Sequence, residues 1–303
     1  MAHETVLLEE SVTALAVKDG GTYVDGTFGR GGHSKAIAAA AKDVTLIAFD
    51  KDETALERGR KELFGSSDST AIAADDKIIL VHETFSKMDE ALKALDIKEV
   101  DGILLDLGFS SDQLEDGRGL TFQKDEPLLM FLGTGEKSPE ENAMDVVNRL
   151  NQEDLEHILK EYGEEKHAGI IARAIVSQRK LDVITTTGRL VKIIEDAAGR
   201  YYRREKIHPA TRTFQALRIY VNDELGELER ALKNGFEMLA PKGRFAVISF
   251  HSLEDRIVKQ FFKEKATEER GTLIVKKPLV PTDEEVTRNR RARSAKLRII
   301  EKI

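Results

Sequence analysis

The sequence predicts an α/β fold in which a mostly parallel sheet is covered by helices on both faces. Through the first third of the chain, short apolar and partly β-branched runs alternate with helix-compatible segments, as they do in βαβ units. The strand pattern fades near residue 114 and resumes after residue 206, which indicates a helical insertion. The last two strand-like runs, 272–277 and 295–303, can pair as an antiparallel edge.

Composition narrows the class of protein. The 303 residues suit one large domain, or one domain with an insertion. No run approaches the ~18 apolar residues of a membrane span, and no signal segment is evident, so we expect a cytoplasmic protein without a membrane partner. The absence of cysteine excludes disulfides, thiolate metal sites and cysteine nucleophiles. The seven histidines show no paired ligand spacing, so no metal is expected.

Charge is strongly segregated along the chain. The net charge of −7 argues by itself against a nucleic-acid partner. The final sixteen residues nevertheless carry a net charge of +6, which leaves −13 on the rest. A basic segment on an acidic protein can still form a local anion-binding surface.

The first four predicted strands span residues 22–27, 44–50, 78–84 and 100–106. The first, second and fourth carry an aspartate at or near their C-terminal ends, namely Asp25, Asp50 and Asp106. Open α/β sheets bind ligands outside the carboxyl ends of their strands. We therefore expect an acidic ligand edge.

The middle of the chain is predicted to be helical. One helix starts at Asn151 and ends at Gly163, and a second covers residues 170–176. A third runs from a Thr187 cap to Gly199. These patterns predict a discontinuous domain formed by residues 1–113 and 207–303, with a helical substrate-recognition insertion at 114–206.

The last part of the chain returns to the α/β pattern. It predicts one long helix over about 211–239, a turn at 241–243 and a strand at 244–250. A final helix follows, and its first turn, from Ser252 to Asp255, has the pattern of a capping box.

The loop after the first strand is rich in glycine. In TYVDGTFGRGGHS (22–34), four glycines fall within seven residues: Gly26, Gly29, Gly31 and Gly32. A dinucleotide fingerprint would need a third glycine where Ser34 stands, and no Gly-Lys-Ser/Thr follows for a phosphate-binding P-loop. Asp50 suits a ribose diol, because both hydroxyls can donate to one carboxylate. These features favour a ligand with a ribose and a positive centre but no phosphate, such as S-adenosylmethionine; the alternative is that the glycines only serve tight turns.

Several long blocks together resemble one family. DGTFGRGGHS, DGILLDLGFSSDQL, YGEEKHAGIIARAIV, HPATRTFQALRIYVNDELGEL, FAVISFHSLEDRIVKQFF and RARSAKLR are similar to the bacterial small-subunit ribosomal RNA methyltransferase H family, formerly called MraW. The resemblance implies a Rossmann-like class I methyltransferase sheet of seven strands with a terminal antiparallel hairpin and an inserted all-helical domain. It also implies S-adenosylmethionine-dependent N4-methylation of a decoding-centre cytidine, cytidine 1402, in 16S ribosomal RNA of the small subunit.

The resemblance also implies a set of cofactor contacts. They are Gly31, Gly32, His33, Asp50, Phe85, Asp106 and Gln113, and we add Asp25 as the acidic end of the first strand. One block departs from the family. Where the family usually has DGPLDMRMD, this chain has DEPLLMFLG at 125–133, so Leu129, Phe131 and Gly133 replace two aspartates and an arginine. The predicted cytosine pocket lies beside this block.

Methyl transfer to an exocyclic amine requires alignment and an acceptor for the amino hydrogens. We expect Asp106, or a carbonyl or hydroxyl among Gly108, Ser110 and Ser111, to accept from N4. The alternatives are that Asp106 contacts only the cofactor and that the serines form a simple turn.

Substrate contacts are predicted in two basic segments. Residues 200–212 interleave cations with tyrosines, and residues 289–294 are rich in arginine, a combination that pairs phosphate charge with stacking surface. The predicted substrate residues are Arg203, Arg204, His208, Arg212, His251, Arg291 and Arg293. Either segment could instead be an ordinary solvated face.

Other functions fit the same sequence less well. The scaffold could methylate another RNA base or a protein, or could be a binding factor for the ribosomal subunit without turnover. Oligomeric state stays open, because the apolar faces of the insertion can pack internally or form a homodimer.

Overall fold

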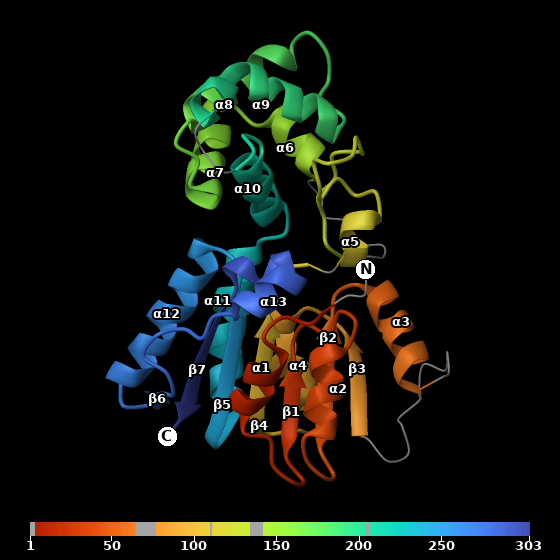
Figure 1. Cartoon of the computed structure of the whole chain (residues 1–303), viewed down its shortest axis with the longest axis vertical. Coiled ribbons are helices and arrows are strands. Elements are labelled where there is room, and N and C mark those ends of the chain that lie inside the picture. The colour runs from red at the N-terminus through yellow and green to blue at the C-terminus, as the bar shows by residue number, and fades with distance from the viewer. Residues whose placement is uncertain (1–3, 65–76, 110, 134–141, 204–206) are drawn as a thin grey trace. The chain divides into compact units, whose positions relative to one another are not determined.

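The computed structural model describes residues 4–64, 77–109, 111–133, 142–203 and 207–303 (Figure 1). The chain forms two compact units. The first comprises Met1–Gly108 and Leu225–Ile303, and the second comprises Phe109–Glu224.

The first unit is built on a seven-stranded sheet with the order β3-β2-β1-β4-β5-β7-β6. The strands are β1 (Thr22–Asp25), β2 (Thr45–Asp50), β3 (Lys77–His82), β4 (Val100–Asp106), β5 (Leu239–Ser249), β6 (Gly271–Leu273) and β7 (Lys296–Lys302). The first five strands are parallel to one another, whereas β7 is antiparallel to both β5 and β6. The predicted seven-stranded α/β sheet with its antiparallel terminal pair is confirmed.

The register of the sheet sets the depth of the three strand-end aspartates. Asp25 is level with Ala48 on β2 and with Leu104 on β4. Asp50 and Asp106 each lie two residues beyond these partners, one pleat closer to the edge. Asp25 therefore lies beneath the other two.

Helices cover both faces of this sheet, as expected for buried parallel strands. The helices of the unit are α1 (Leu8–Leu15), α2 (Gly32–Ala39), α3 (Glu53–Phe64), α4 (Met88–Ala94), α11 (Glu224–Met238), α12 (Ser252–Thr267) and α13 (Asp283–Arg288), with short 3-10 turns η1 (Phe85–Lys87) and η2 (Arg290–Ser294). One apolar cluster joins the sheet to α4, α11 and α12. A second joins it to α1, α2 and η2.

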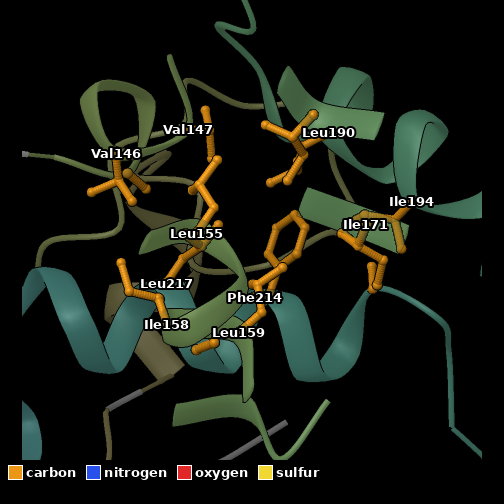
Figure 2. Packing of buried hydrophobic residues seen from close by; sticks show 14 of the residues in the cluster. Val146, Val147, Leu155, Ile158, Leu159, Ile171, Leu190, Ile194, Phe214 and Leu217 are labelled. Carbon is orange, nitrogen blue, oxygen red and sulfur yellow. The ribbon is translucent and has the colours of Figure 1, made fainter. Parts of the chain in front are cut away.

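The second unit is helical in the part that the structure describes. Its helices are α5 (Ser111–Glu115), α6 (Ala143–Arg149), α7 (Gln152–Gly163), α8 (Ala168–Gln178), α9 (Thr187–Tyr202) and α10 (Thr211–Val221). Buried aliphatic side chains from α6, α7, α8, α9 and α10 meet around Phe214 to form a core of the unit's own (Figure 2). Among the described helices of the whole chain, none has the length and apolar composition to cross a membrane.

Several helix boundaries differ from the predictions, and α8 extends beyond the predicted 170–176 at both ends. The cap of α9 is Thr186, whose side chain accepts from the Arg189 backbone N–H, and the helix continues past Gly199 to Tyr202. The single helix predicted over 211–239 is wrong, because the chain breaks into α10 and α11 at Asn222 and Asp223. Asp223 has a left-handed φ of 47°, and the Asn222 side chain bonds the backbone at Met130 and Leu132.

The predicted strand at 244–250 also begins earlier, at Leu239. Leu239 pairs with Val100, and after a register shift Arg244 pairs with Gly102. The predicted turn at 241–243 is thus an irregularity inside β5.

Candidate cofactor and substrate site

The glycine-rich loop runs from the end of β1 into α2. Gly29 and Gly31 have left-handed φ values of 54° and 71°, a backbone conformation that favours glycine. Gly31 is the residue before α2, and its N–H donates to the Phe28 carbonyl at 2.7 Å. The sequence therefore needs glycine here for the sharp turn that starts the helix.

Three of the four glycines also face other parts of the protein at close range. A Cβ atom on Gly26 would lie 2.3 Å from Leu105, one on Gly31 would lie 2.8 Å from the Phe28 ring, and one on Gly32 would lie 2.0 Å from the Thr5 hydroxyl. Gly29 differs, because its nearest neighbour would be the Thr27 carbonyl at 3.9 Å. Tight internal packing therefore explains glycine at three of the four positions. At Gly29 no neighbouring atom lies close to the position of a Cβ.

Asp25 supports this loop from below. Its side chain is 0% exposed and accepts from the Ser34 hydroxyl at 2.6 Å and from the Thr27 N–H at 3.1 Å. Burial raises the pKa of Asp25, and the hydrogen bonds from Ser34 and Thr27 oppose that rise. In this position the carboxyl group fixes the start of α2 against the end of β1.

Asp50 ends β2 beside the same loop. Its two carboxylate oxygens accept from the Gly29 N–H and the Asp52 N–H, each at 2.8 Å. Burial raises the pKa of Asp50 to about 6, although these hydrogen bonds lower it. Each carboxylate oxygen has a further lone pair, so the group keeps the capacity to accept from a ribose diol.

Asp106 ends β4 on the other side of β1. Its backbone N–H donates to the Thr27 hydroxyl at 2.7 Å, and its Oδ2 lies 3.7 Å from Nδ1 of His33 on α2. Burial raises the pKa of Asp106 well above its ordinary value, and the charges of Asp25 and Glu254 raise it further.

The other oxygen of this carboxyl group is the most informative atom of the site. Asp106 Oδ1 is buried and has no hydrogen-bond partner within the described residues. Buried polar atoms are nearly always paired. An acceptor left in this state at a strand end fits a ligand that donates a hydrogen bond, such as an amine or a hydroxyl.

Two further predicted cofactor residues border the loop. His33 is only 4% exposed, so its ring is enclosed between α2 and the strand ends. Phe85 begins η1 and packs against the cluster under α4 and α11, and its Cβ lies close to the Gly26 backbone.

His251 caps α12. Its Nδ1 accepts from the Glu254 N–H at 3.4 Å, and Glu254 accepts in return from the His251 N–H at 3.2 Å. The predicted capping box from Ser252 to Asp255 is therefore wrong by one residue. Asp255 pairs instead with Lys296 and Arg298 on β7, at 3.0 and 2.7 Å.

Gln113 belongs to the second unit, on α5. It is 8% exposed, and its amide donates to the Leu132 carbonyl at 2.9 Å. Arg118 also donates to the Leu132 carbonyl and to that of Gly133, at 3.3 and 3.0 Å. Both side chains thus hold the end of the atypical block. Ser110 lies outside the described residues, and of Ser111 the structure describes only the backbone, at the start of α5.

The atypical block alternates between buried and partly exposed residues. Leu128, Met130 and Leu132 are at most 3% exposed and join the core of the second unit. The three residues that depart from the family pattern, Leu129, Phe131 and Gly133, are partly exposed. The substitutions therefore change the accessible side of the block and leave its buried side apolar.

The first predicted basic segment is partly engaged within the second unit. His208 stacks on Phe122 with 4.8 Å between ring centroids, and its Nε2 lies 3.3 Å from Glu195. Arg212 lies over the Tyr202 ring at 5.9 Å, and Tyr202 donates to the buried Glu165. Arg203 is exposed, and Arg204 lies outside the described residues.

The second basic segment is in the first unit. Arg291 and Arg293 are exposed on η2, while Ala292 between them is fully buried. The segment is tied to the N-terminal arm, because Asn289 donates to the Glu4 carbonyl at 3.0 Å and Arg288 pairs with Glu4 at 3.2 Å. This anchoring presents the arginine side chains on a fixed backbone.

Sequence reasoning missed the residues that hold the site together. Thr27 positions Asp106, Ser34 bonds Asp25, and Glu254 contributes charge near Asp106. Ser34 stood in the quoted loop motif, but its role depends on a contact across the start of α2. Glu254 would have been found by treating His251 as the cap, a position that usually holds serine, threonine, aspartate or asparagine.

A family model and full-length relatives match the chain from end to end. The model of the MraW methylase family matches residues 1–303. A ribosomal RNA small subunit methyltransferase H from Caldicellulosiruptor saccharolyticus is 44% identical over 318 residues, covering 99% of each chain. The protein of the same name from a Wolbachia species is 44% identical over 306 residues, covering 100% of each chain. Among solved structures, an rRNA methylase from Streptococcus thermophilus aligns with a TM-score of 0.46 at 12% identity, covering 100% of this chain and 99% of that one.

Proposed function

The chain belongs to the MraW methylase family, and on this premise we propose that it methylates N4 of cytidine 1402 in the 16S RNA of the small ribosomal subunit. The family assignment made from the sequence is confirmed, and with it the methyltransferase class and S-adenosylmethionine as cofactor. The names of the relatives support a small-subunit RNA substrate. The atom and the nucleotide that receive the methyl group are proposals, as is action in the cytoplasm.

The strand ends of the first unit suit this cofactor. Asp50 would accept from the ribose hydroxyls, the loop around Gly29 would lie along the ligand, and Phe85 would contact it from the start of η1. The cofactor supplies a methyl group on a positively charged sulfonium, which is already activated for displacement. The protein's own residues therefore have to bind, orient and exclude water more than they have to act as a strong base.

The observation that carries the proposed chemistry is the unpartnered Oδ1 of Asp106. The lone pair of a cytosine amino group is delocalised into the ring. A carboxylate that accepts one of the amino hydrogens helps to localise this lone pair and stabilises the positive charge that develops as the new bond forms. Asp106 is assigned this role. Contact with the cofactor alone is the alternative role for the same oxygen.

Substrate binding is assigned to the two basic segments and to His251. Arg291 and Arg293 on η2 would contact RNA phosphates, and Arg203, Arg204, His208 and Arg212 would act from the second unit. We assign substrate recognition to the helical insertion at 114–206. Its atypical block exposes Phe131 where the family usually has arginine, which favours, as a second candidate function, methylation of a different base on the same scaffold.

Complementation tests the proposal in cells. A strain that lacks the gene is supplied with the wild-type gene, with Asp106→Ala, or with Asp101→Asn, a control at the opposite end of the same strand. Nucleoside mass spectrometry of 16S RNA should show N4-methylated cytidine with the wild type and the control, and none with Asp106→Ala. Methylation of another base would favour the second candidate. Unchanged RNA in all strains would favour a binding factor without turnover.

A further inference from the structure

The 3-10 turn η1 begins at Phe85. The residues before and after Phe85 in the chain are both hydrogen-bonded to side chains of α11. The Thr84 hydroxyl donates to Oε2 of Glu227 on α11. Ser86, which is 4% exposed, receives a bond at its carbonyl from the Asn234 side chain at 2.9 Å. The residues that flank Phe85 are thus both fixed to the same helix.

Glu227 is the centre of this arrangement. Its other oxygen accepts from Arg230 at 2.8 Å, one turn further along α11. Burial raises the pKa of Glu227, but hydrogen bonds from Ser86, Thr84 and Arg230 outweigh it, so the pKa lies below its ordinary value. The carboxylate is therefore charged at neutral pH and bonds both neighbours of Phe85.

The position of Phe85 matters because it lies against the glycine loop. A Cβ on Gly26 would come within 3.1 Å of the Phe85 Cβ and within 2.3 Å of Leu105. A small shift of η1 would therefore move Phe85 relative to the backbone that leads into Gly29. The Thr84 hydroxyl does not cap η1, so the bond to Glu227 takes the place of a local contact.

We propose that Glu227 is a positioning residue for cofactor binding, which acts by holding Thr84 and Ser86 so that Phe85 faces the cofactor. This inference rests on the proposed function, in which Phe85 contacts S-adenosylmethionine. Glu227 itself does not touch the reacting atoms in this assignment. Loss of its carboxylate should weaken cofactor binding and raise KM for the cofactor, with a smaller effect on kcat.

Calorimetry with S-adenosylmethionine and a double-mutant cycle with Phe85 test the inference. Glu227→Ala should raise Kd by about tenfold, whereas Glu227→Gln, which keeps an oxygen acceptor, should recover most of the affinity. Glu229→Ala, an exposed substitution on the same helix, serves as the matched control and should bind like the wild type. In a Phe85→Ala background, Glu227→Ala should add little further loss, because the two residues act through one contact.

Three outcomes would overturn the inference. They are an unchanged Kd for Glu227→Ala despite a lowered Tm, full additivity with Phe85→Ala, and no effect of Phe85→Ala alone. Failure of the proposed function is a separate result: wild-type protein would bind the cofactor, with the Glu227 effect intact, and yet methylate no ribosomal RNA.

Discussion

Nδ1 of His33 lies 3.7 Å from Oδ2 of Asp106, so the first turn of α2 meets the end of β4 across β1. The His33 side chain is 4% exposed and the Asp106 side chain 24%. Asp25 lies fully buried nearby and accepts from Ser34 on the same helix. The strand ends therefore form an acidic cluster in which Asp106, a partly exposed member, has one buried oxygen without a partner among the described residues.

Replacing Asp106 by asparagine should stabilise the protein without cofactor. The pKa of Asp106 in the folded protein is raised above 3.8, so the folded state binds the proton more tightly than the unfolded state. The free energy of unfolding of the wild type therefore falls as pH rises from about 4 through the folded pKa. Thermal unfolding should give Asp106→Asn the higher Tm at pH 8, and the difference should narrow towards pH 4.

The same variant should lose activity, by about 10²-fold or more in kcat if Asp106 accepts from the amino group. Asp101→Asn, at the other end of β4, is the control for activity, and Glu57→Gln, at an exposed position on α3, is the control for Tm. If Asp106→Asn is more stable but fully active, Asp106 has no role in methyl transfer. If the difference in Tm between variant and wild type does not change with pH, the pKa of Asp106 is not raised.

Cofactor binding should depend on the ionisation of Asp50. Its pKa is about 6, and the ribose hydroxyls need the carboxylate as acceptor. Affinity should be constant between pH 7 and 8 and should fall about tenfold by pH 5, one unit below this pKa. Calorimetry across this range measures the profile. Asp50→Asn should bind more weakly at pH 7.5 and lose the step near pH 6; an identical profile in wild type and variant would assign the titration to another group.

Removing the Ser34 hydroxyl should destabilise the fold. Ser34→Ala takes one hydrogen-bond donor from the fully buried Asp25 carboxyl, and such a loss costs about 1–3 kcal/mol. Urea denaturation measures the change. Ser294→Ala, at an exposed position on η2, should stay within about 0.5 kcal/mol of the wild type. Equal stability of the two variants would mean that Asp25 does not depend on this bond.

The arginines of η2 should contribute to RNA affinity through charge. Arg291→Ala combined with Arg293→Ala should weaken binding of small-subunit RNA and reduce the slope of log K against log salt by about 1.4–1.8, as expected for two lost phosphate contacts. A filter-binding titration at several salt concentrations gives both values. Lys233→Ala combined with Lys263→Ala removes the same charge from exposed positions on α11 and α12. An equal loss in this control would indicate a general charge effect, without a defined contact at η2.

The sequence predicted the strand ends well because they depend on local pattern. Apolar runs that end in aspartate gave β1, β2 and β4, and strand order then aligned Asp50 and Asp106 on either side of Asp25. The break between α10 and α11 was missed because the helical pattern continues through Asn222. What ends the helix is the bond from Asn222 to a backbone segment about ninety residues earlier in the chain.

The supporting contacts of the site could not be predicted from the sequence either, because they join residues that are far apart in the chain. Thr27 bonds the Asp106 backbone, and Thr84 bonds Glu227, across separations of 79 and 143 residues. The sequence also did not reveal the reason for two of the glycines in the loop. The pattern predicted close approach of backbone and ligand, whereas Gly26 and Gly32 are required by close contact with Leu105 and Thr5. At these two positions only the fold identifies the neighbour that makes glycine necessary.

Methyl transfer in vitro tests the proposed substrate and the proposed role of Asp106 in one experiment. Purified small subunits from a strain lacking the gene are incubated with the protein and tritiated S-adenosylmethionine, and the RNA is digested for nucleoside mass spectrometry. Label should appear in N4-methylcytidine with the wild type and with Asp101→Asn, and it should be absent with Asp106→Ala. Cofactor binding by calorimetry without label in any form of the subunit would contradict the proposed function.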